Sequence, residues 1–120
     1  MAHHCKHAIV RDVGQVMVIE MTRADLIDQD FVDELTIDLN AVIDCVEGTP
    51  QVVISLERVQ FLSSYTIGML IALKERINDR GGTLRLADVN VNVKEVFRLT
   101  RLADVIPIDE NTAKAVEQMS

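Results

Sequence analysis

Aromatic residues are scarce in this 120-residue chain, which has three phenylalanines, one tyrosine and no tryptophan. A surface that binds single-stranded nucleic acid by stacking bases on aromatic rings therefore has few rings to use. Basic residues are also in the minority, because 12 lysines and arginines stand against 19 aspartates and glutamates, for a net charge of −7. An acidic chain gains nothing from counterion release on DNA, so we predict no direct nucleic-acid binding.

Signals for secretion, membrane insertion and cross-linking are also lacking. No apolar run approaches the roughly 18 residues that a membrane span needs, and residues 1–11 lack the apolar stretch of a secretory signal. The two cysteines, Cys5 and Cys45, form neither a CxxC pair nor a disulfide framework. We therefore expect a cytoplasmic protein without a membrane span.

Residues for catalysis or metal binding are few and poorly spaced. His3, His4, Cys5 and His7 lie within five residues at one end, whereas structural zinc sites usually draw their ligands from separated segments. No other histidine is available for a Ser-His-Asp triad or a Cys–His pair. We predict no enzyme active site, no metal and no cofactor.

Hydrophobic residues, in contrast, make up 48% of the chain, and charged residues make up 26%. This composition is typical of a folded protein, and the length fits a single domain with an aliphatic core. We expect residues 1–7 to form a flexible N-terminus and residues 8–120 to form the domain.

Hydrophobic periodicity predicts strands that alternate with helices after a first hairpin. The expected strands cover 8–13, 16–21, 51–56, 83–87 and 105–108. The expected helices cover 30–46, the stretch from Ser64 to the Gly81-Gly82 pair, 91–100, and a last segment capped by Asn111. This order favours an α/β fold, a mixed and largely parallel β-sheet packed with about four α-helices.

The most informative segment joins the third strand to the second helix and reads Phe61-Leu62-Ser63-Ser64-Tyr65-Thr66-Ile67-Gly68. With Ser63 as the N-cap, Ser64 becomes the first helical residue, and Leu62 and Ile67 take the two positions of a hydrophobic staple. An anion on Ser64 would lie next to the unpaired N–H groups and the positive end of the helix dipole. The alternative is that Ser63 only caps the helix and that Ser64 is simply exposed to solvent.

Four segments around this point form a longer pattern. They are Val53-Ile54-Ser55-Leu56-Glu57-Arg58-Val59-Gln60-Phe61-Leu62-Ser63-Ser64, Ile67-Gly68-Met69-Leu70, Gly81-Gly82-Thr83-Leu84-Arg85-Leu86 and Val96-Phe97-Arg98-Leu99-Thr100-Arg101-Leu102. Together they resemble the core of the STAS domain family, which is named after sulfate transporters and anti-sigma factor antagonists. The resemblance covers about residues 8–118 and points to the stand-alone bacterial anti-sigma factor antagonist (anti-anti-sigma) branch.

The resemblance implies a partner switch. In that branch the unphosphorylated domain binds an anti-sigma factor that is also a serine protein kinase, phosphorylation breaks the complex, and a PP2C-type phosphatase resets it. The family motif Asp-Ser-[Ser/Thr]-Gly-Leu-Gly places the phosphorylated serine at Ser64. Ser63, Tyr65 and Thr66 depart from the Asp, the second Ser or Thr, and the Gly of that motif.

We therefore expect phosphorylation of Ser64, with Ser63 and Thr66 as alternative acceptors. The residues that the resemblance implies for partner binding are Leu62, Ser63, Ser64, Tyr65, Thr66, Arg98 and Arg101. One alternative is a constitutive scaffold subunit of a signalling or transporter-associated complex, which the altered flanks of Ser64 favour. Another is a module that senses a nucleotide or an anion at the start of the second helix.

Charge is unevenly distributed along the chain. Residues 17–50 hold nine acidic side chains and a single base, Arg23. This acidic segment is either a docking surface for a partner of opposite charge or a solvated helix face.

Overall fold

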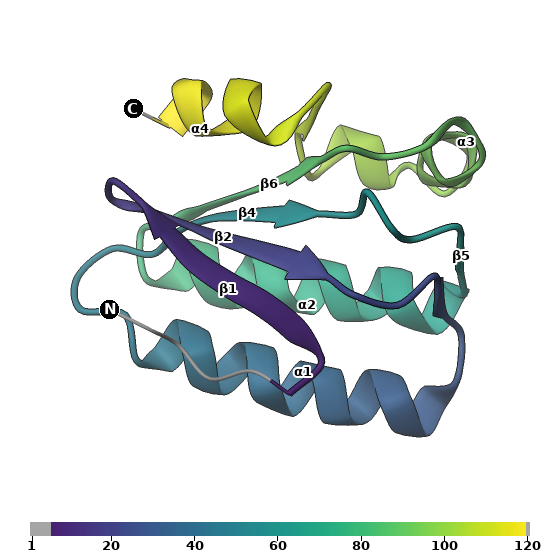
Figure 1. Ribbon diagram of the computed structural model, residues 1–120, viewed down its shortest axis with the longest axis horizontal. Helices are drawn as coiled ribbons and strands as arrows, with labels where there is room; N and C mark the ends of the chain where they lie inside the picture. The colour runs from purple at the N-terminus through teal and green to yellow at the C-terminus, as the bar shows by residue number, and fades with distance from the viewer. Residues whose placement is uncertain (1–5, 120) are drawn as a thin grey trace.

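The computed structural model describes residues 6–119, which form one layered α/β unit (Figure 1). The elements, in chain order, are β1 (Ala8–Val13), β2 (Val16–Met21), β3 (Asp25–Leu26), α1 (Gln29–Asp44), β4 (Gln51–Ser55), β5 (Phe61–Leu62), α2 (Ser64–Asp79), β6 (Thr83–Ala87), α3 (Val91–Leu99), a 3-10 helix (Leu102–Asp104), β7 (Ile108–Asp109) and α4 (Thr112–Met119). Residues 1–5, which hold His3, His4 and Cys5, lie outside the described residues.

The main sheet has five strands in the order β1-β2-β4-β6-β7. β1 runs antiparallel to β2, and every other neighbouring pair in this sheet is parallel. The prediction of a mixed, largely parallel sheet with four α-helices is therefore confirmed. β4 is the central strand of this sheet. The segment that leads to α2 begins at its carboxyl end.

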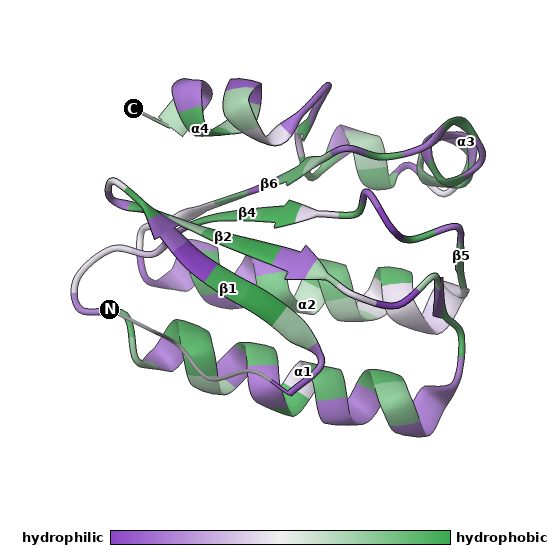
Figure 2. Ribbon diagram, in the orientation of Figure 1, coloured by the Kyte–Doolittle hydropathy of each residue, from purple (hydrophilic) through white to green (hydrophobic). Residues whose placement is uncertain are grey.

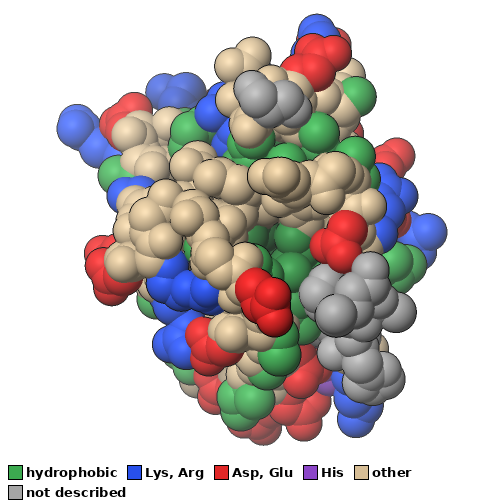
Figure 3. Space-filling model, turned by 90° about the vertical axis from the view of Figure 1, so that its left-hand side faces the viewer, with side chains coloured by type: hydrophobic (Ala, Val, Ile, Leu, Met, Phe, Trp, Pro, Cys, Tyr) green, Lys and Arg blue, Asp and Glu red, His purple; other side chains and the backbone are tan. Residues whose placement is uncertain are grey.

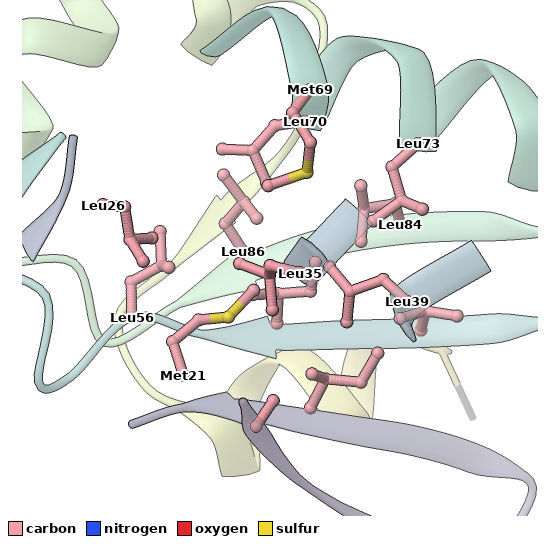
Figure 4. Packing of buried hydrophobic residues seen from close by; sticks show 14 of the residues in the cluster. Met21, Leu26, Leu35, Leu39, Leu56, Met69, Leu70, Leu73, Leu84 and Leu86 are labelled. Carbon is pink, nitrogen blue, oxygen red and sulfur yellow. The ribbon is translucent and has the colours of Figure 1, made fainter. Parts of the chain in front are cut away.

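Helices cover both faces of this sheet (Figure 1). α1 and α2 pack on one face, where side chains such as Leu35, Leu70 and Leu86 point toward one another (Figure 4). α4 covers part of the other face, where Ala115 lies in a smaller apolar cluster with Val18 and other strand residues. The hydropathy colours are consistent with this packing: β2 and β4 are mainly hydrophobic, while hydrophobic and hydrophilic residues alternate along α1 and α2 (Figure 2).

Polar side chains cap the starts of α1, α3 and α4. The side chain of Asp28 accepts from Asp30 N and Phe31 N at the start of α1. Asn90 accepts from Val93 N at α3, and Asn111 accepts from Lys114 N at α4. These hydrogen bonds satisfy N–H groups that have no partner inside the helix.

The sequence predicts that the first helix ends at residue 46, two residues later than the observed end of α1. The helix ends at Asp44, and an arginine from the end of α2 donates to the carbonyls around this helix end. The guanidinium of Arg80 donates to Ile43 O at 2.6 Å, to Val46 O at 2.6 Å and to Gly48 O at 2.7 Å. The chain therefore leaves the helix while its last carbonyls keep a hydrogen-bond donor.

The strand predicted over 105–108 is wrong. A 3-10 helix covers Leu102–Asp104, and pairing with β6 begins only at the carbonyl of Pro107, which accepts from Leu86 N at 2.9 Å. Pro107 has no N–H to donate to a ladder, so the strand follows it as Ile108–Asp109. Two short strands, β3 and β5, were not predicted at all and form a separate parallel pair.

The sequence predicts that His7 belongs to a flexible N-terminus, whereas the structure places its side chain against α1. Its ring packs edge-on against Phe31 at a centroid distance of 4.7 Å. Its Nε2 lies 3.1 Å from Glu34 Oε2. His7 is therefore attached to the first helix.

Candidate partner-binding site

The bridge, defined here as residues 56–63 between β4 and α2, is fixed from two sides. On one side, β5 pairs with β3, with Phe61 opposite Asp25 and Leu62 opposite Leu26. Gln60 N donates to Ala24 O at 2.7 Å, which fixes the start of this pairing. The bridge contains no helix and only a two-residue strand, and these backbone hydrogen bonds hold it in place.

The other side of the bridge is buried against α3. Leu56 and Val59 are fully buried in the main core. The side chain of Asn90, besides capping α3, donates through Nδ2 to Val59 O at 2.7 Å. This single amide therefore joins the start of α3 to the bridge, a role that the capping pattern in the sequence did not predict.

Ser63 and Thr66 are used inside the turn. Ser63 Oγ accepts from Thr66 N at 3.4 Å, which confirms Ser63 as the N-cap of α2. Thr66 is fully buried, and its hydroxyl donates to Leu26 O at 2.5 Å. A kinase cannot reach a hydroxyl in that position while the fold is intact, so Thr66 is a poor acceptor and a poor contact residue.

Ser64 and Tyr65 point outward instead. Ser64 is the first residue of α2 and is exposed. Tyr65 is 42% exposed, and its hydroxyl donates to Asp33 Oδ1 on α1. This hydrogen bond, followed by partial burial and the negative charges of Asp33 and Asp30, raises the pKa of Tyr65 above its usual value.

A hollow of about 480 Å³ lies between α1 and α2 at this point. Its lining residues are Gln29, Asp33, Thr36, Ser64, Tyr65, Gly68 and Met69. A Cβ added to Gly68 would meet no atom within 4 Å, so the wall of the hollow is open at this glycine. Ser64 therefore stands at the edge of a concave surface that carries one carboxylate and no base.

Two apolar side chains that we had not predicted extend this surface. Ile27 is 51% exposed and Phe61 is 59% exposed. Phe61 lies opposite Asp25 in the β3–β5 pair, and Ile27 follows β3 directly, so both belong to the outward side of this pair. Only the alternation of inward and outward residues across β3 and β5 could have revealed them, and two-residue strands give too short a pattern.

Arg98 and Arg101 are not brought to Ser64 by any hydrogen bond or ion pair among residues 6–119. Arg98 forms a bidentate pair with Glu95 on its own helix, which raises the pKa of Arg98 and lowers that of Glu95. Arg101 follows α3 in a left-handed conformation, with φ of 62°. Both are exposed, as is Leu99 between them.

A larger hollow, about 680 Å³, lies at the other end of the strands. Its walls come from the β1–β2 turn and the α1–β4 connection, including Gly14, Cys45 and Thr49. Figure 3 faces this end and shows hydrophobic side chains in the depression and acidic ones at its rim. No sequence motif points to this hollow.

The part of the chain that the structure describes holds neither a metal-binding cluster nor a membrane-spanning helix. No group of three or more His, Cys, Asp or Glu side chains there is arranged to hold a metal ion. None of the described helices combines the length and the apolar character that crossing a bilayer requires.

Comparison with known sequences gives one family. The family model described as the STAS domain matches residues 2–115. An anti-sigma F factor antagonist from Paenibacillus polymyxa is 29% identical over 68 residues, which are 57% of this chain and 58% of that relative. The chain thus aligns with somewhat more than half the length of this curated relative.

Comparison with solved structures gives the same family. An anti-sigma-factor antagonist (STAS) domain protein from Planctomyces limnophilus has a TM-score of 0.84 and 25% identity, over 100% of this chain and 99% of that one. The Bacillus cell fate determinant SpoIIAA in its phosphorylated form has a TM-score of 0.68 and 17% identity, over 94% and 99% of the two chains. The second similarity concerns the fold alone.

Proposed function

This chain belongs to the STAS domain family, and we propose that it is an anti-sigma factor antagonist-like switch that is regulated by phosphorylation of Ser64. In this role it acts in the cytoplasm without catalysing a reaction of its own. Its partner is an anti-sigma factor that is also a serine protein kinase. A PP2C-type phosphatase returns Ser64 to its unmodified form.

One observation carries the proposal: Ser64 is the exposed hydroxyl at the start of α2, on a segment that is otherwise fixed. Ser63 and Thr66 are occupied in the turn, whereas the Ser64 hydroxyl is left for a partner. The name of the Paenibacillus relative supports an anti-sigma factor as that partner. The phosphorylated state named for SpoIIAA supports covalent control.

The chemistry is a phosphoryl transfer. Ser64 Oγ forms a bond to the γ-phosphorus of ATP, the bond from that phosphorus to the bridging oxygen of ADP breaks, and the hydroxyl proton leaves to a base of the kinase. The product carries about −1.5 to −2 charges at pH 7. The positive end of α2 accommodates this charge, so the domain stays folded. In a contact built for a neutral hydroxyl the same charge is desolvated, and the partner dissociates.

The docking surface comprises the exposed side chains of Ile27, Phe61, Ser64 and Tyr65, together with the half-buried Leu62. Their apolar atoms provide area that a partner can bury, and Tyr65 is a residue type that often anchors interfaces. Arg98 and Arg101, which are exposed at the end of α3, are the second choice for partner contacts.

A constitutive scaffold remains the second candidate, and a specific contact favours it. The hydrogen bond from Tyr65 to Asp33 holds a bulky ring next to Ser64, where the family motif has a small residue. A ring in this position restricts the approach of a kinase. A scaffold would bind its partner whatever the charge at position 64.

Mass spectrometry of phosphopeptides across residues 59–74, on protein from its own growing and stressed cells, tests the switch. We expect phosphate on Ser64 that changes with condition, and unmodified Ser63 and Thr66. Unmodified Ser63, Ser64 and Thr66 in both conditions would favour the scaffold.

A binding assay with the anti-sigma factor kinases of the same cells completes the test. Ser64→Asp should weaken binding at least about tenfold, which corresponds to about 1.4 kcal/mol. Ser64→Asn has nearly the same size without the charge and is the matched control. Equal binding by the two variants would exclude an electrostatic switch.

A further inference from the structure

The hydrogen bond between Tyr65 and Asp33 lies where a phosphate on Ser64 would act. Tyr65 follows Ser64 on α2, and its hydroxyl donates to Asp33 on α1. Ser64, Tyr65 and Asp33 all line the hollow of about 480 Å³ between these helices. A charge added at Ser64 therefore shares one concave surface with the carboxylate that holds the tyrosine.

This surface has no base to neutralise a phosphate. Among the seven lining residues Asp33 is the only charged one. Three arginines of the neighbouring elements are already paired with carboxylates. These pairs are Arg23 with Asp25, Arg58 with Glu20, and Arg76 with Asp44. Asp30, near the start of α1, adds to the negative potential at Tyr65. A phosphate on Ser64 thus meets only like charge from α1.

The phosphate is also held in place. The first N–H groups of α2 attract an anion attached to Ser64, so the group stays at the helix start rather than turning into water. Asp33 is exposed, so its carboxylate can turn toward solvent once its hydrogen bond with Tyr65 breaks. Of the two negative groups, the Asp33 carboxylate is therefore the one that moves.

We propose that phosphorylation of Ser64 separates Tyr65 from Asp33, so that the tyrosine side chain leaves α1 and changes the shape of the docking surface. The proposal rests on the proposed function for the identity of the acceptor, Ser64. It adds a second route to partner release, because the surface changes in shape as well as in charge. The motif of the family has a small residue where Tyr65 stands, so the device belongs to this chain.

The chain provides its own reporter, because Tyr65 is its single tyrosine and it has no tryptophan. A carboxylate that accepts a hydrogen bond from a phenol quenches its fluorescence, so the emission of Tyr65 reports the contact with Asp33. Phosphoserine is introduced at position 64 during translation, and the emission is compared with and without the substitution Asp33→Asn.

In the unmodified protein, Asp33→Asn should raise the emission. In the phosphorylated protein, the emission should already be raised to that level, and Asp33→Asn should add nothing. Ser64→Glu should behave like the phosphorylated protein, and Ser64→Gln, which is matched in size but uncharged, should keep the full response. An equal response to Asp33→Asn in phosphorylated and unmodified protein would overturn the proposal.

The experiment separates this proposal from the function on which it rests. Phosphoserine is installed without a kinase, and no partner is present, so a negative result refutes the device and leaves partner switching intact. If cells never phosphorylate Ser64, the mass spectrometry shows it, and the coupling between the two side chains is still measured. Circular dichroism of each variant confirms that the comparison is made between folded proteins.

Discussion

Replacement of Arg80 by alanine should destabilise the domain far more than replacement of Arg76, although both arginines join α2 to the end of α1. Arg80 donates three hydrogen bonds of 2.6–2.7 Å to the carbonyls of Ile43, Val46 and Gly48. At roughly 1 kcal/mol for each bond, and with water replacing part of the loss, Arg80→Ala should lower the free energy of unfolding by about 2–3 kcal/mol.

Arg76 is the matched control. It lies four residues earlier on α2 and forms a bidentate ion pair with Asp44. Both side chains are about half exposed, at 45% and 50%, so water and salt screen the pair, and Arg76→Ala should have little effect. The two differ because Arg80 satisfies backbone carbonyls at a helix end, whereas Arg76 satisfies only another surface charge.

Urea denaturation followed by circular dichroism measures both effects. For a domain of this size the midpoint should fall by about 1–2 M for Arg80→Ala. Arg80→Lys should lie between the wild type and Arg80→Ala, because an ammonium cannot span three separate carbonyls. Equal losses for Arg76→Ala and Arg80→Ala would refute the argument that the carbonyls determine the end of α1.

Two other predictions concern the turn before β6 and the tyrosine. A Cβ on Gly82 would lie 1.9 Å from Pro50 O, so Gly82→Ala should cost about 3 kcal/mol or more in thermal or urea unfolding. Gly81 has room for a Cβ but a φ of +78°, so Gly81→Ala should cost only about 1–2 kcal/mol. In a titration followed by absorbance, Tyr65 should ionise above pH 10, and Asp33→Asn should lower its pKa. Because the folded-state pKa is the higher one, this contact stabilises the domain below about pH 10 and is lost as the pH rises through that pKa.

Most of the fold could be predicted because its long elements carry their own signals. The periodicity of β1, β2, β6 and α2 matched their observed bounds within a residue or two, and Ser63 and Asn111 marked the starts of α2 and α4. What escaped prediction depends on distant partners. The early end of α1 requires Arg80, which comes 36 residues after Asp44 in the sequence. The β3–β5 pair consists of two-residue strands that exist only because the chain brings them together.

In the candidate site, too, local features could be predicted from the sequence and contacts between distant residues could not. The spacing of the bridge correctly placed Ser63 at the cap and Ser64 at the first position of α2. Local pattern could not reveal that Asn90 donates to Val59 O, or that Asp33 accepts from Tyr65. Each of these contacts joins elements that are about 30 residues apart, at separations of 31 and 32.

The departures from the family motif divide into two kinds once their surroundings are known. Ser63 is half-buried and Thr66 is fully buried, and a hydroxyl at each position bonds the turn to itself or to Leu26 O. They replace the aspartate and the glycine of the motif, and both hydroxyls are used inside the turn. Tyr65 faces outward and changes both the shape and the charge environment next to Ser64. If this chain selects a different partner from its relatives, Tyr65 and Asp33 are therefore the residues in which that difference should be sought first.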